Sequence, residues 1–189
     1  MSEEVKKKKQ KESPVYMITS VALMAAILCI CGPLTVPIGP IPITLFIFAL
    51  ALCSIILGAV KAPLCVLIYL LLGIAGVPVF SGGVVGIAKL LGPSGGYLVG
   101  WIFHAFIGGL FAQKFIKKIP LVFVGQILGL IVVYLLGTAW YMYSAKVALA
   151  PAMAACVYPF IGIDIGKIVV AMAIGIPVRR QLMKMNLIK

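Results

Sequence analysis

Long apolar runs, separated by proline, glycine and charged residues, make up most of the chain. With these interruptions taken as boundaries, the apolar runs cover residues 14–31, 42–60, 62–76, 94–115, 121–141 and 154–178. A helix needs about 20 residues to cross the hydrocarbon core of a membrane. The pattern therefore predicts an all-α membrane protein, a compact bundle of six transmembrane helices in which the second and third are short.

The composition agrees with this pattern and excludes several classes of activity. Hydrophobic residues make up 63% of the 189 residues and charged residues only 11%, whereas a soluble domain has roughly half apolar and a quarter charged residues. The sequence has no GxxxxGK[ST], HExxH or GxSxG motif. Its five cysteines lack CxxC spacing, which favours a packing role. We therefore expect no enzymatic activity, no catalytic residue, no metal site and no ATP hydrolysis.

Basic residues indicate the orientation of the bundle. Six spans would place on one side the N-terminal tail, Lys61, the 114–118 connection and the basic residues from Arg179 onward, and would leave only Lys89 and Lys146 on the other side. The excess of positive charge marks the cytoplasmic side, so both termini are predicted to be cytoplasmic. Basic tails at 1–13 and 179–189 would then flank a membrane domain at 14–178. This topology and contact with the lipid bilayer explain the net charge of +12 without nucleic acid.

Two ionisable residues are predicted to lie inside the membrane, Asp164 and Lys167. Asp164 is the single acidic residue beyond the N-terminal tail, and Lys167 follows three positions later, on the same face of a helix. A charge that faced lipid would cost about 2.5 kcal/mol or more, so both side chains should point into the bundle. They could form a structural ion pair. They could also form a ligand site, with the carboxylate accepting from ligand N–H groups and the ammonium holding a ligand carboxylate.

The connections predicted on the extracytoplasmic side are unusually apolar. One, at 32–42, has four prolines, and the other, at 77–93, is rich in glycine. Non-helical backbone near membrane depth is tolerated only where protein or a cavity satisfies it, and glycine lets a ligand approach the backbone closely. These segments are therefore predicted to be walls of a pocket, with Pro40, Ile41 and Pro42 as its cover. Two tight connections without a ligand role are the alternative.

Several motifs occur together in this chain. They are the LLLGIAGVPVF stretch at 70–80, Gly82-Gly83, the GPSGGYL stretch at 92–98, the VPIGPIPIT stretch at 36–44, and the pair Asp164 and Lys167. Together they closely resemble the BioY family, the biotin-binding S components of energy-coupling factor (ECF) vitamin transporters. The resemblance covers essentially the whole membrane domain. Two positions depart from it: Ser94 stands where relatives usually have Thr, and Phe46 stands where Gln is expected.

The resemblance implies a six-helix substrate-binding subunit that captures biotin from outside the cell. It would work with a membrane coupling protein and two cytoplasmic ATPase subunits, and it would need no cofactor. In the implied site, Asp164 accepts from the ureido N–H groups, Lys167 engages a carbonyl or carboxylate, and Ser94 keeps a hydroxyl. Phe80, Tyr97 and the backbone of Gly82 and Gly83 enclose the rings. The opposite polarity, in which Lys167 holds the carboxylate and Asp164 orients Lys167, stays open.

A second surface is indicated on the first helix by Ala22 and Ala26. Small residues four positions apart let helices approach closely, and in S components that resemble this chain such a pair faces the membrane coupling protein. Packing within the bundle is the alternative. Among the other polar residues, Gln126 could reach the pocket or bond a neighbouring helix. Candidate interfacial anchors are included among Trp101, Trp140, Tyr141 and Tyr143.

Two other classes of function compete with the transporter subunit. A solitary proton-coupled secondary carrier for a small carboxylate or vitamin would use Asp164 as its proton site. A membrane enzyme is disfavoured because the predicted membrane domain supplies no pair of nucleophile and base.

Overall fold

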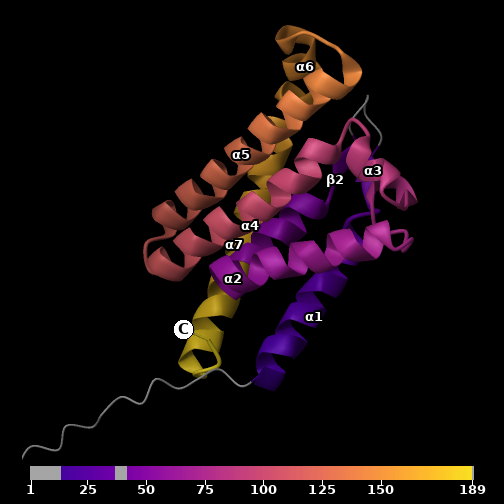
Figure 1. Cartoon of the computed structure of the whole chain (residues 1–189). Helices are drawn as coiled ribbons and strands as arrows, with labels where there is room; N and C mark the ends of the chain where they lie inside the picture. The colour runs from indigo at the N-terminus through magenta and orange to yellow at the C-terminus, as the bar shows by residue number, and fades with distance from the viewer. Residues whose placement is uncertain (1–13, 37–41, 189) are drawn as a thin grey trace, which may run out of the picture.

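Five apolar helical spans form the bundle in the computed structural model, which describes residues 14–36 and 42–188. The spans are α1 (Pro14–Cys31), α2 (Phe46–Ile74), α4 (Gly95–Phe115), α5 (Ile119–Ala145) and the pair of α6 (Leu149–Cys156) and α7 (Tyr158–Lys184) (Figure 1). Each is long and apolar enough to cross a membrane. The predicted runs 42–60 and 62–76 both fall mostly inside α2. The expected helical membrane protein is therefore present, with these two predicted helices assigned as one.

A break at Gly58 divides α2 into two halves. Gly58 has φ 81° and ψ −171°, a conformation that glycine adopts without steric cost. Figure 1 shows the two halves running in different directions. The predicted boundary between the runs 42–60 and 62–76 fell at Lys61, which was wrong by a few residues. Proline inside a helix normally crowds the carbonyl of the residue four positions earlier. For Pro63 that residue is Ala59, which directly follows the break, so Pro63 fits inside the second half.

Close contacts hold the break against the rest of the bundle. A Cβ atom on Gly109 of α4 would collide with the backbone at Gly58, so the two helices approach here as closely as glycine permits. On α5, the Gln126 amide donates to the Ser54 hydroxyl of α2 at 3.0 Å. Gln126 therefore bonds a neighbouring helix, and it is not among the residues that line the main cavity.

The C-terminal part of α7 is tied to two other helices by arginines. The Arg179 guanidinium is buried and donates to the carbonyls of Ile55 at 3.1 Å and Ile56 at 2.8 Å, just before the break in α2. Arg180 donates to the Ile116 carbonyl at the end of α4 at 3.0 Å. Carbonyls at helix ends lack partners within their own helix, which explains why these donors are used. The segment predicted as a tail from residue 179 is thus helical through Lys184.

The short elements gather at the end of the molecule opposite the C-terminus. The strands β1 (Thr35–Val36) and β2 (Ile43–Thr44) pair antiparallel, with Thr35 opposite Thr44. The 3₁₀ turn η1 (Ser81–Gly83) and the one-turn helix α3 (Ala88–Leu91) lie between α2 and α4. Figure 1 shows α3, β2 and α6 at this end. The two connections predicted to be pocket walls are therefore brought to the same end of the bundle.

Candidate ligand-binding site

A cavity at this end of the bundle collects residues from most of the chain. Its walls come from β2 and the segment before it, both halves of α2, the connection between α2 and α4, and α4 to α7. The lining is mostly apolar and aromatic, with a few polar groups, which is the usual composition of a small-molecule site.

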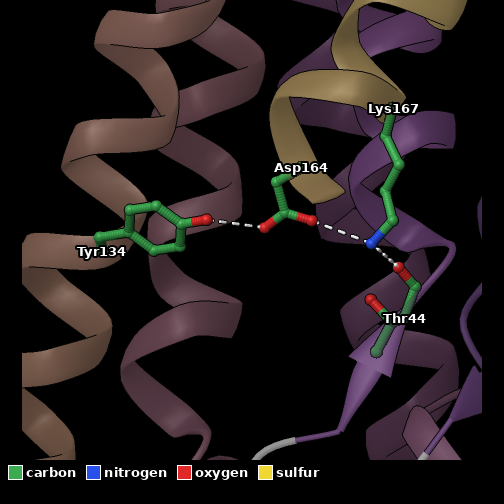
Figure 2. Close-up of polar contacts among 4 residues, drawn as sticks. All are labelled: Thr44, Tyr134, Asp164 and Lys167. Atoms are coloured by element: carbon green, nitrogen blue, oxygen red, sulfur yellow. Dashed lines mark hydrogen bonds and ion pairs between the residues drawn. The ribbon is translucent and has the colours of Figure 1, made fainter. Parts of the chain in front are cut away.

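The polar centre of the site is the Asp164 carboxylate on α7. One of its oxygens, Oδ2, accepts from the Tyr134 hydroxyl of α5 at 2.9 Å, and the other, Oδ1, accepts from Lys167 Nζ at 2.9 Å (Figure 2). Lys167 Nζ also donates to the Thr44 carbonyl of β2 at 2.6 Å. The side chains of Lys167 and Asp164 are 13% and 5% exposed. The pair therefore joins α7 to α5 and to the β hairpin.

This geometry gives the two charged residues different positions. Asp164 lines the cavity, whereas Lys167 is not among the lining residues. A carboxylate offers about four lone-pair sites and an ammonium three donors. Asp164 therefore has acceptor capacity left beyond its bonds to Tyr134 and Lys167. The arrangement can receive N–H donors from a ligand at Asp164 while Lys167 fixes the orientation of the carboxylate.

Aromatic side chains form another part of the wall. Phe80 is buried and meets the Tyr69 ring edge-on, with 5.5 Å between ring centroids. The Tyr69 hydroxyl donates to the Val79 carbonyl at 3.0 Å, which fixes the ring. Trp101 also lines the cavity and stacks on Phe46 at 3.9 Å between centroids. Trp101 is thus a buried wall residue and is not one of the interfacial anchors.

The structure brings together most of the residues predicted for the site. Asp164, Phe80, Ser94, Tyr97 and Pro42 all line the cavity. The Tyr97 hydroxyl donates to the Cys156 carbonyl at 3.3 Å, so its ring is held between α4 and α6.

Other predicted site residues lie elsewhere. Gly82 and Gly83 are exposed, with φ 74° and 73°, and are not among the lining residues, although their neighbour Ser81 is. Their role in enclosing a ligand stays a prediction. Pro40 and Ile41, the rest of the predicted cover, lie outside the described residues.

Two polar residues of the cavity, Tyr134 and Lys89, were not among the predicted site residues. Tyr134 gave no signal, because one tyrosine in an apolar helix has many roles. Lys89 was used only to orient the bundle, although a lysine inside an apolar connection could have been noticed. The structure places Lys89 in the cavity wall, half-buried. Burial lowers the pKa of its ammonium, since an apolar environment disfavours the charged form.

The predicted docking pair lies on a different surface. Ala22 and Ala26 are exposed on α1. They line an apolar groove whose other wall is formed by Leu64, Ile68 and Leu72 of α2. Both alanines therefore remain accessible to another helix in the membrane.

Comparison with known proteins identifies the family. The BioY family model matches residues 4–184. The chain is 35% identical to the biotin transporter BioY2 of Lactococcus lactis over 93% of this chain and 97% of that protein. It is 37% identical to a probable biotin transporter BioY of Pyrococcus horikoshii over 84% and 93% of the two chains.

A solved structure gives the same result for the fold. The crystal structure of the S component for biotin from an ECF-type ABC transporter matches with a TM-score of 0.82 and 30% identity, over 88% of this chain and 92% of that one. The chain therefore belongs to the BioY family.

Proposed function

We propose that this chain is the biotin-binding S component of an ECF-type ABC importer and captures biotin at the extracytoplasmic side. One observation carries the proposal: in a member of this family, a carboxylate fixed by two donors faces an aromatic-lined cavity. Biotin offers complementary groups, namely two ureido N–H donors, an apolar ring system and an aliphatic chain that ends in a carboxylate. The chain is a multi-pass integral protein of the cell membrane and is not an enzyme.

In the proposed complex, Asp164 accepts from the ureido N–H groups and Lys167 holds Asp164 in place. The rings of biotin lie against Phe80 and Tyr97, and Ser94 supplies a hydroxyl at the start of α4. This assignment follows from the cavity lining, in which Asp164 takes part and Lys167 does not. Each Asp164 oxygen can accept a further hydrogen bond, so this site favours ligands that carry N–H groups.

The proposed topology has six spans and cytoplasmic termini. In this proposal the two halves of α2 count as separate spans, which is supported by the break at Gly58 between them and by their different directions (Figure 1). The start of α1 and the end of α7 lie at the same end of the molecule (Figure 1). Arg180 joins the basic connection at Lys117 and Lys118 through its bond to Ile116. This end carries the positive charge expected of the cytoplasmic side, and the cavity lies at the other end.

The energy for import comes from partners in this proposal. A membrane coupling protein docks on α1, and two cytoplasmic ATPase subunits drive transport. The exposed pair Ala22 and Ala26 and the apolar groove beside it support this surface, since small residues permit close helix packing within a membrane.

Isothermal titration of the detergent-purified protein with biotin tests the proposal. We expect saturable binding to the wild-type protein and none to the Asp164→Asn, Lys167→Ala double variant. The double variant removes both charges together, so no unpaired charge is left buried. Absence of biotin binding by folded wild-type protein would overturn the proposed function. Equal binding by the two proteins would show that Asp164 and Lys167 do not form the biotin site.

A further inference from the structure

We propose that Lys89 binds the carboxylate of the ligand, so that the cavity recognises an acid with N–H donors at one end and a carboxylate at the other. The inference rests on the proposed function and deepens it. It assigns the anionic group of the ligand to a residue on α3, apart from Asp164 and Lys167 on α7.

The exposure of α3 is the first argument. Ile87 and Leu91, on either side of Lys89 in the sequence, are 59% and 66% exposed, whereas Lys89 is half-buried and lines the cavity. In water the opposite order is expected, because lysine is among the side chains least often buried. In a membrane protein, apolar residues can face lipid. Ile87 and Leu91 are thus exposed, whereas Lys89, the single charged residue of the short helix, lines the cavity.

The charge balance of the cavity is the second argument. Asp164 is the only acidic residue in the described part of the chain, and its charge is already matched by Lys167. Within residues 14–36 and 42–188, the side-chain ammonium of Lys89 has neither a hydrogen bond nor an ion pair to the protein. The cavity therefore carries one uncompensated positive charge. A carboxylate brought by the ligand would neutralise it.

The third argument comes from the cost of burial. The apolar surroundings of Lys89 disfavour its ammonium and lower its pKa. A bound carboxylate would offset this cost, because charge-assisted hydrogen bonds are shorter and stronger than neutral ones. The flexible stem of lysine suits a carboxylate at the end of an aliphatic chain. Lys167 is less suited to this role because its ammonium already donates to Asp164 and Thr44.

Paired titrations with biotin and biotinamide test the inference. Biotinamide has the same rings and chain, with a neutral amide in place of the carboxylate. Lys89→Met removes the charge and keeps an unbranched apolar stem. Lys146→Met is the matched control, because Lys146 is an exposed lysine on the same predicted side of the membrane and is not among the lining residues.

We expect Lys89→Met to weaken biotin binding by about 10- to 100-fold, the range for a hydrogen bond to a charged group, and to leave biotinamide binding unchanged. Lys146→Met should bind both ligands as the wild type does. Unchanged biotin affinity in Lys89→Met would overturn the inference, and so would an equal loss for both ligands, which would indicate a steric role. A wild-type protein that binds neither ligand would refute the proposed function itself. Retained biotinamide binding shows that the variant is folded.

Discussion

The ion pair between Asp164 and Lys167 makes a quantitative prediction about stability. Asp164→Asn removes the negative charge and leaves the Lys167 ammonium, 13% exposed, with the Thr44 carbonyl as its neutral acceptor. Removing one partner of a buried ion pair costs about 3–5 kcal/mol of the free energy of unfolding. For a chain of this size, 1 kcal/mol shifts Tm by about 2–4 °C. We therefore expect Asp164→Asn to melt about 6–20 °C below the wild type.

A second variant distinguishes destabilisation by the unpaired Lys167 charge from destabilisation by lost packing. Asp164→Asn combined with Lys167→Met removes both charges, and replacing a whole buried pair with apolar groups is often neutral. The double variant should therefore melt at a higher temperature than Asp164→Asn alone. Thermal unfolding in detergent, followed by tryptophan fluorescence, measures the difference. If the double variant were the less stable one, the reasoning about an unpaired Lys167 charge would be refuted.

Two further predictions concern the docking surface and the cavity wall. Replacing both Ala22 and Ala26 with Trp should abolish biotin uptake in cells that also produce the coupling protein and ATPases, while biotin binding persists. Leu23→Trp, also at an exposed position of α1, is the control. Equal uptake by the double variant and this control would argue against docking at Ala22 and Ala26. Gly73→Ala would place a Cβ atom against the Phe80 ring, and overpacking costs about 1–3 kcal/mol. Biotin affinity measured by titration should then fall at least about fivefold. An unchanged affinity would show that the position of the Phe80 ring does not affect biotin binding.

The sequence was informative where one residue type has few possible roles. An acid and a lysine three positions apart in an apolar helix can only pair or face a polar space, so Asp164 and Lys167 were found. Proline and glycine likewise marked the two connections at the cavity end. These signals depend on local spacing and on the cost of burying charge, and both can be read from one segment at a time.

The features that were missed depend on contacts between distant segments. Tyr134 becomes a site residue only because α5 lies beside Asp164, 30 positions away in the sequence. The break in α2 occurs at Gly58, where a glycine of α4 approaches, and not at the charged residue and proline that normally mark a helix boundary. Trp101 is a wall residue because Phe46 from α2 stacks on it. No single segment contains this information.

The broken helix α2 has a mechanical consequence for the cavity. Ile47 in its first half and Tyr69 in its second both line the cavity, and each is eleven positions from Gly58. At 1.5 Å per residue, each arm is about 16 Å long, so a change of about 5° in the angle at Gly58 moves either tip by about 1.4 Å. The two halves of α2 thus form two arms joined by a hinge at Gly58. The hydrogen bonds from Arg179 to the carbonyls of Ile55 and Ile56 hold the backbone next to this hinge. The aperture available to a ligand is thus set at a joint that the ligand never touches.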